Sequence, residues 1–165
     1  VLGGGEVGAP GGADAGKGKV VLDTPRTQAL IGFVHEGPQA TSNLEADKVE
    51  NPFSCLFLTS LDGRPIAEST RLLLTTTARA SHTGFEWNAD HKTVKNWGRA
   101  PTVIEPVTGA VELLDLGEAR SVEVQPLAAE GRPLGEPVRA EQNGGRWQIP
   151  VGDPPATWYV VEVQR

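Results

Sequence analysis

The chain has 165 residues, the size of one domain, and folding a chain of this length buries roughly 70% of the surface that its unfolded form exposes. A net charge of −6 argues against a basic surface that could bind the phosphate groups of nucleic acids or anionic lipids. We therefore expect this chain to bind neither nucleic acid nor membrane. The single cysteine, Cys55, excludes an internal disulfide, and no apolar run approaches the ~18 residues of a membrane-spanning helix.

The first nineteen residues, Val1 to Lys19, are rich in glycine and have almost no periodic hydrophobicity. Such a segment cannot bury enough apolar surface to offset its ordering entropy, which predicts a flexible linker over 1–19. The sequence has no methionine and no signal peptide at its beginning. We therefore expect a fragment of a longer or processed chain, with another domain upstream.

From Val20 onward, short apolar runs alternate with turn residues about every ten positions, a pattern typical of an all-β sandwich or barrel. The first predicted strands are 20–23, 27–35, 53–60 and 71–80. The run 53–60 is continuously apolar, which predicts a strand deep in the core with both faces covered. Asp62-Gly63 supplies the positive φ of a tight turn after it.

Six further short strands are predicted after a polar stretch, and they cover 102–104, 110–116, 121–127, 137–141, 146–151 and 157–164. Asn143-Gly144-Gly145 indicates a hairpin between two of them. There is no alternation of strands and helices, so a parallel nucleotide-binding sheet is excluded. We predict one antiparallel β-sandwich over 20–165, of jelly-roll or immunoglobulin-like type.

Catalytic and metal-binding motifs are weak. The sequence has no Gly-x-Ser-x-Gly motif whose serine a histidine could activate as a general base. His82 and His91 lie nine residues apart, which matches no standard spacing of zinc ligands. Acidic side chains that could act as a pair in glycoside hydrolysis are Glu86, Asp90, Glu105 and Glu112. In a chain this acidic we interpret them as solvated surface groups and expect no enzyme activity. No cofactor is expected; a structural calcium stays open, and no metal ligand can be assigned.

The few aromatic residues fall in two groups. Trp147 and Tyr159 alternate with aliphatic residues and are predicted to be core. Trp87 and Trp97 flank the polar stretch 88–96, which looks like a long loop or irregular hairpin, and Trp158 is exposed if its sheet face is uncovered. Tryptophans on a polar loop either plug the end of the core or present a ring to a partner, and we favour plugging because large aromatics are highly buried on average.

A sugar ring has apolar C–H faces and a rim of hydroxyls, so its site needs an aromatic platform with polar neighbours. Side chains that supply this chemistry are Trp87, Trp97, Asn88, Asp90, His91, Lys95 and Asn96, with Trp158 as a further candidate. The sequence therefore permits a carbohydrate site at this polar stretch.

Four segments carry a resemblance to a known family: Val21 to Gln28, Leu58 to Ile66, Arg71 to Thr75 and Arg79 to Trp87. They resemble the non-catalytic β-sandwich at the C-terminus of multidomain bacterial glycoside hydrolases, over about Val20 to Trp87. The resemblance implies a secreted accessory domain that lies C-terminal to a catalytic domain. It assigns no catalytic residue to this chain.

Two functions follow as hypotheses. The first is a monomeric carbohydrate-binding module that anchors an attached glycoside hydrolase to polysaccharide. The alternative is a structural accessory domain whose exposed apolar patch packs on the catalytic barrel and stabilises it without binding glycan.

Overall fold

The computed structural model describes residues 18–34, 40–90 and 92–165, and the described chain is almost entirely strands and turns. The predicted linker over 1–19 lies outside the described residues except for its last two positions, and Lys19 already belongs to the first strand. No helix in the described ranges has the length and apolar character to cross a membrane.

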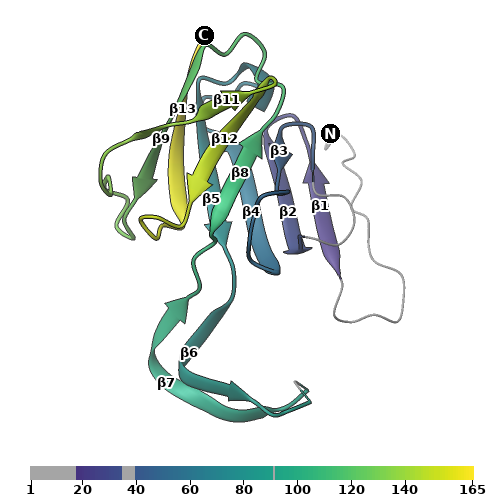
Figure 1. Ribbon diagram of the computed structural model, residues 1–165, viewed down its shortest axis with the longest axis vertical. Coiled ribbons are helices and arrows are strands. Elements are labelled where there is room, and N and C mark those ends of the chain that lie inside the picture. The colour runs from purple at the N-terminus through teal and green to yellow at the C-terminus, as the bar shows by residue number, and fades with distance from the viewer. Residues whose placement is uncertain (1–17, 35–39, 91) are drawn as a thin grey trace.

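Two antiparallel sheets and one projecting hairpin make up the fold (Figure 1). The large sheet has the order β1 (Lys19–Asp23), β2 (Thr27–Phe33), β4 (Phe53–Ser60), β5 (Arg71–Thr77), β13 (Trp158–Gln164), β9 (Ser121–Leu127) and β10 (Val138–Arg139). The small sheet has the order β11 (Glu141–Asn143), β12 (Arg146–Val151), β8 (Gly109–Leu113) and β3 (Leu44–Glu45). The predicted all-β antiparallel sandwich is confirmed.

The core lies between the two sheets, and in strands such as β4, β5 and β13 buried and more exposed side chains alternate. On the inner side of the large sheet, Leu56 and Leu58 of β4 lie beside Thr76 and Leu74 of β5, and all four side chains are buried. Trp147 and Tyr159 are 4% and 2% exposed, so their predicted core positions are confirmed.

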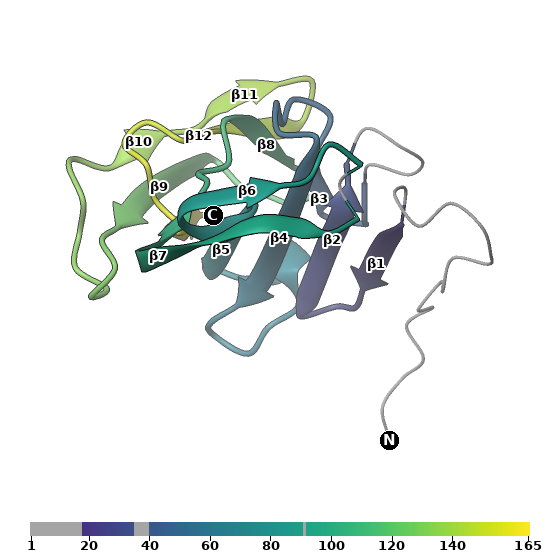
Figure 2. The ribbon, with the colours of Figure 1, turned by 90° about the horizontal axis from the view of Figure 1, so that it is seen from below.

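The prediction that both faces of 53–60 are covered is wrong. In β4 only every second side chain is buried, while Phe53, Cys55 and Phe57 point outward and are half-buried. The small sheet covers one face of the large sheet, and among the described elements no strand or helix is stacked on the other face (Figure 2). The apolar run therefore reflects an apolar outer face.

A buried polar network joins the sheets near the turn between β1 and β2. The Gln28 side chain is 1% exposed; its Oε1 accepts from Thr41 Oγ1 at 2.7 Å and its Nε2 donates to Asn43 Oδ1 at 3.0 Å. Asn43 Nδ2 in turn donates to the Leu114 carbonyl at 2.9 Å. Since each buried polar group in this chain of contacts has a partner, the network fixes one sheet against the other.

The turn after β4 depends on one carboxylate. Asp62 accepts hydrogen bonds from the Thr70 N–H at 2.8 Å, the Arg64 N–H at 3.1 Å, and the hydroxyls of Ser60 and Ser69 at 2.9 Å each. Together these donors hold the pKa of Asp62 well below its usual range, and the hydrogen bond from the Thr70 N–H contributes most to this lowering. The loop that contains the short helix η1 (Ile66–Glu68) is thus tied to both flanking strands.

Replacing this carboxylate by the Asp62→Asn substitution should lower the melting temperature at neutral pH by several degrees. Because the folded-state pKa lies below the unfolded value of about 3.9, the stabilisation is present above that pH and is lost as the pH falls below it. Thermal unfolding from about pH 6 to about pH 2 should therefore show the two proteins converging in acid. A pH-independent difference would contradict this account, and Glu118→Gln, at an exposed position, is the control.

Candidate functional site: the aromatic arm

A long hairpin leaves the sandwich between β5 and β8 and forms a separate two-stranded sheet, which we call the arm. It consists of β6 (Ala80–Trp87) and β7 (Val94–Ile104). Figure 1 shows that the arm extends beyond the ends of the sandwich strands and curls back beneath them. In Figure 2, which is seen from below, the arm passes in front of β5, β4 and β2. The stretch interpreted from sequence as a loop or irregular hairpin is thus a hairpin, with a turn at 88–93.

Two register shifts bend the arm, one between His82 and Thr83 and one between Glu86 and Trp87. Bulges of this kind increase twist and curve a ribbon. Gly98 lies opposite the first bend with φ +70°, and a Cβ there would lie 2.6 Å from the Thr83 carbonyl oxygen and 2.8 Å from the Phe85 nitrogen. The curvature therefore requires glycine at position 98.

One face of the arm carries an aromatic cluster of Phe85, Trp87 and Trp97. Phe85 and Trp97 are direct cross-strand partners, and Trp87 is two residues beyond Phe85 on the same strand. The Phe85 ring meets both tryptophans edge to face, with centroids 5.1 Å from Trp87 and 6.4 Å from Trp97. Trp87 is 48% and Trp97 72% exposed, so the favoured interpretation that they plug the core is wrong.

The opposite face of the arm is polar. Lys95 Nζ pairs with Glu86 Oε2 at 2.8 Å, and hydrogen bonding to this carboxylate raises the Lys95 pKa. Closer to the sandwich, His82 Nδ1 and Thr102 Oγ1 lie 3.2 Å apart across the strands. Lys95, predicted as a sugar-contacting residue, is therefore engaged in an ion pair with Glu86.

The predicted polar residues at the arm tip build the turn. Asn88 Nδ2 donates to Thr93 Oγ1 at 2.6 Å, and Asp90 Oδ1 accepts from the Lys92 N–H at 3.0 Å. Asn96 Oδ1 accepts from the Gly98 N–H at 2.9 Å. His91 lies outside the described residues. These residues share the tip with the aromatic cluster, and their hydrogen bonds are local.

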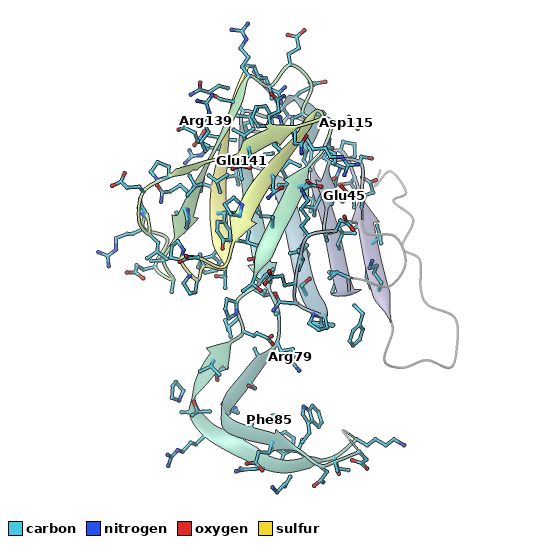
Figure 3. The ribbon with its side chains drawn as sticks, in the orientation of Figure 1. Glu45, Arg79, Phe85, Asp115, Arg139 and Glu141 are labelled. Carbon is cyan, nitrogen blue, oxygen red and sulfur yellow. The ribbon has the colours of Figure 1, made fainter. Side chains whose placement is uncertain are left out.

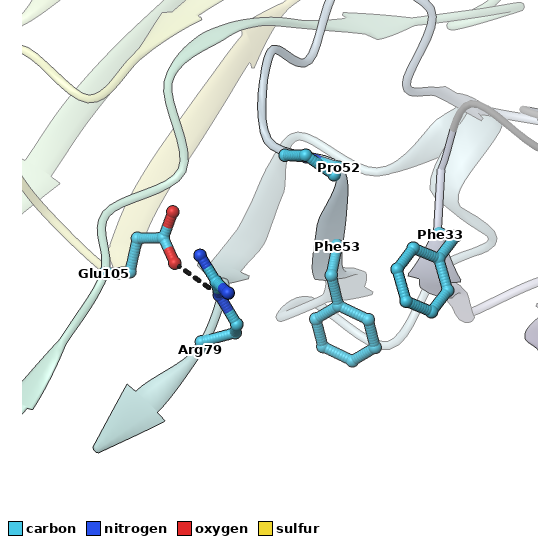
Figure 4. Close-up of a pocket in the computed structure, with 5 residues that line it drawn as sticks. All are labelled: Phe33, Pro52, Phe53, Arg79 and Glu105. Carbon is cyan, nitrogen blue, oxygen red and sulfur yellow. Dashed lines mark hydrogen bonds and ion pairs between the residues drawn. The ribbon is translucent and has the colours of Figure 1, made fainter. Parts of the chain in front are cut away.

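A hollow of about 560 Å³ lies between the arm and the adjoining end of the sandwich. Its lining includes Phe85 and Trp87 from the arm and Phe53 from the start of β4. A second hollow of about 300 Å³ is lined by Phe33, Pro52, Phe53, Arg79 and Glu105 (Figure 4). Since Phe53, Arg79 and Glu105 line both, the two hollows adjoin, and we call them together the arm trough.

The base of the arm is fixed by an ion pair and a buried amide. Arg79 Nε donates to Glu105 Oε2 at 2.9 Å (Figure 4). The Asn51 side chain is 7% exposed; it donates to Glu105 Oε1 at 3.3 Å and to the Pro106 carbonyl at 3.1 Å, and it accepts from the Thr108 N–H at 2.8 Å. Figure 3 shows Arg79 where the arm joins the sandwich and Phe85 farther along the arm.

Trp158 lies apart from this site, on the outer face of the large sheet, and is 36% exposed. Its cross-strand partners there are Thr75 of β5 and Leu127 of β9. The predicted residues therefore divide into an arm group and one tryptophan on the sheet.

Sequence reasoning missed several residues of the arm trough: Phe33, Phe53, Arg79, Phe85, Val103, Ile104 and Glu105. A sequence pattern could have placed Phe85 in the site, because Phe85 alternates with Trp87 at the period of a strand. No sequence pattern places Phe33 and Phe53 there, since their approach to the arm depends on where the hairpin leaves the sandwich.

Three of the four acidic residues considered for hydrolysis have a cationic partner, each in a different place, while Asp90 accepts the Lys92 N–H in the arm turn. Glu86 pairs with Lys95 on the arm, Glu105 with Arg79 at its base, and Glu112 with Lys48 at 2.8 Å on the small sheet. Hydrogen bonding to Lys48 lowers the Glu112 pKa, whereas burial raises that of the neighbouring Glu45. Within 18–34, 40–90 and 92–165, no three His, Cys, Asp or Glu side chains gather as metal ligands would.

Comparisons with protein-family models, with curated proteins and with solved structures found no match to this chain. The argument for function therefore depends on the arm, the arm trough and the sheet faces.

The close backbone approach at Gly98 makes a local prediction. Gly98→Ala should distort the arm while leaving the sandwich melting temperature nearly unchanged, because the arm is a separate sheet. Limited proteolysis should then cut residues 80–104 faster. Gly84→Ala is the matched control: Gly84 has φ +77° on the same arm, but nothing lies within 4 Å of its Cβ position. Equal cleavage of the two variants would show that the close approach does not matter.

Proposed function

We propose that this domain is a non-catalytic module that binds polysaccharide along the aromatic face of its arm, over Trp97, and in the adjoining arm trough, which Phe85 and Trp87 border. The observation that carries the proposal is the exposure of Trp87 and Trp97 on one face of a projecting ribbon that also borders a hollow. An exposed aromatic cluster of this kind is unusual on a monomer surface, where large apolar patches mark binding sites.

The chemistry of the arm trough suits a sugar chain. Indole and phenyl rings offer apolar surface to the C–H faces of a pyranose, while Arg79 donates and Glu105 accepts hydrogen bonds beside them. The edge-to-face packing on Phe85 restricts both tryptophans, so less conformational entropy is lost when a ligand binds. These features support binding without requiring a catalytic group.

In the parent protein, such a module would hold an attached glycoside hydrolase on its substrate outside the cell. Tethering raises the effective concentration of the polymer at the catalytic domain without any new contact there. The upstream catalytic domain and the secreted location are part of the proposal and rest on the family resemblance of Val20 to Trp87.

Affinity electrophoresis tests the proposal directly. The isolated chain should be retarded in gels that contain one of xylan, mannan, mixed-linkage glucan or cellulose derivatives. A Trp87→Ala, Trp97→Ala double variant should lose at least about tenfold in affinity, since stacking on each ring contributes on the order of 1 kcal/mol.

The matched control is Trp158→Ala, which removes an exposed indole from the sheet and should leave retardation unchanged. Both variants are first compared with wild type by melting temperature, to show that they remain folded. Unretarded migration of the wild type on every glycan would refute the proposal.

A second candidate is a structural accessory domain, and the outer face of the large sheet favours it. One cross-strand row on this face runs Ala29, Phe57, Thr75, Trp158 and Leu127. Phe57, Trp158 and Leu127 are the accessible apolar members of this row, whereas Thr75 is polar and Ala29 is fully buried. The accessible apolar members form a surface that fits a folded neighbour, such as a catalytic barrel.

A double substitution, Phe57→Ser with Trp158→Ser, tests this second candidate in the full parent protein. If the sheet face packs on a catalytic domain, the melting temperature of that domain should fall by several degrees while glycan retardation persists. An unchanged melting temperature would count against the structural role.

A further inference from the structure

We infer that the arm trough takes an internal stretch of an uncharged polysaccharide, in preference to an acidic polymer or a chain end. This inference deepens the proposed function and rests on it. Three observations carry it: the charge balance of the lining, the pairing of donor and acceptor at its middle, and the attachment of the arm at one end only.

The lining of the arm trough has no net charge. Its charged members are Arg79 and Glu105, which pair with one another, and the remaining lining residues are Phe33, Pro52, Phe53, Ala78, Ala80, Ser81, Phe85, Trp87, Val103 and Ile104. The whole chain carries −6, so a polyanion approaching the trough is repelled over distances set by the Debye length. Arg79 cannot offset this repulsion, because its charge is already balanced by Glu105.

Other cations of the arm lie outside the lining. Lys95 is paired with Glu86, and none of Lys92, Lys95 and Arg99 borders either hollow. An acidic chain in the arm trough would therefore meet one cation, Arg79, which is already paired with Glu105, and its other carboxylates would lie against aromatic rings. Burying an anion without a cationic partner is unfavourable, whereas hydroxyl groups face no such penalty.

The ion pair at the middle of the arm trough suits neighbouring hydroxyls. The Arg79 guanidinium uses Nε for Glu105, and its planar fork carries further N–H donors in fixed geometry. Glu105 accepts from Arg79 and from Asn51 and retains acceptor capacity on its carboxylate. A donor and an acceptor held side by side match two adjacent sugar hydroxyls, one accepting and one donating.

The shape of the site favours a chain interior. The arm is joined to the sandwich at Arg79 and Glu105, and its turn at 88–93 lies at the far end, beneath the sandwich (Figure 1). A polymer can therefore enter sideways past the turn without threading an end. Aromatic side chains border both of the adjoining hollows, Phe33 the smaller and Phe85 and Trp87 the larger, and the ion pair borders both. Such a lining contacts successive sugar units of a continuing chain.

The charge part is tested with matched polymers, hydroxyethyl cellulose against carboxymethyl cellulose, and neutral arabinoxylan against glucuronoxylan and polygalacturonate. We expect the intact chain to be retarded more strongly by the neutral member of a pair, with little change from about 0.05 to about 0.5 M NaCl. Retardation only by acidic polymers, weakening as salt rises, would overturn the inference while leaving polysaccharide binding established.

The chain-interior part is tested by cutting the bound neutral polymer to about half its mean length at constant mass, which doubles the number of ends. A site for chain interiors should give the same affinity per mass of polymer, whereas a site for ends should give about twofold tighter binding. Tighter binding after cutting would overturn this part. Absence of retardation on every polymer would instead refute the proposed function, so the two failures are distinguishable.

Two substitutions locate the effect. Arg79→Lys keeps the charge and the pairing with Glu105 but removes the planar fork, and should weaken retention by the neutral polymer about fivefold to tenfold. Arg132→Met removes an exposed cation of the sandwich that lies outside the arm and borders neither hollow, and it should leave that retention unchanged. If Arg132→Met weakens retention and Arg79→Lys does not, the assigned lining is wrong.

Discussion

The buried amide of Asn51 holds the arm in place on the sandwich. It contacts Glu105, Pro106 and Thr108, the segment by which β7 returns to the core, and Glu105 in turn holds Arg79 at the start of the arm. Loss of this amide would leave the half-buried Thr108 N–H without its side-chain acceptor, at a cost of about 1 kcal/mol. Because a two-stranded ribbon is marginally stable in water, its direction depends on such a fixed base. The arm trough exists only because the ribbon leaves at this angle and curls back.

The arm and the sandwich have different physical origins. The sandwich is stabilised by a shared core, in which Tyr159 and Trp147 from opposite sheets are nearly inaccessible. The arm has local support: cross-strand contacts such as Phe85 with Trp97 and Glu86 with Lys95, and glycines that allow its bends. The two exposed tryptophans on an element that contributes little to the core are what supports the proposed binding role of the arm. The outer sheet face around Trp158 is a separate surface, so the two proposed functions are compatible.

The sequence predicted most strands of the sandwich, since alternation of apolar residues reports burial directly: 53–60, 121–127 and 146–151 coincide with β4, β9 and β12. The segment 53–60 also shows the limit of this reasoning, because in a sequence an apolar residue on an uncovered sheet face cannot be told from an apolar residue in a core. The arm was recognised only as an irregular polar stretch, since its bulges break the period of two and its polar face hides the alternation of Phe85 and Trp87. The set of residues that lines the arm trough depends on how distant segments pack together, and no local sequence pattern predicts it.

The central claim is that Trp87 and Trp97, and not the other two of the four tryptophans, contact the ligand. The most direct measurement is to follow the four indole N–H signals by heteronuclear NMR while a neutral oligosaccharide of the retained polymer is added. The account predicts that the signals of Trp87 and Trp97 move in a saturable way, while those of the buried Trp147 and of Trp158 on the sheet stay in place. Movement of the Trp158 signal alone, or of none of the four, would contradict it.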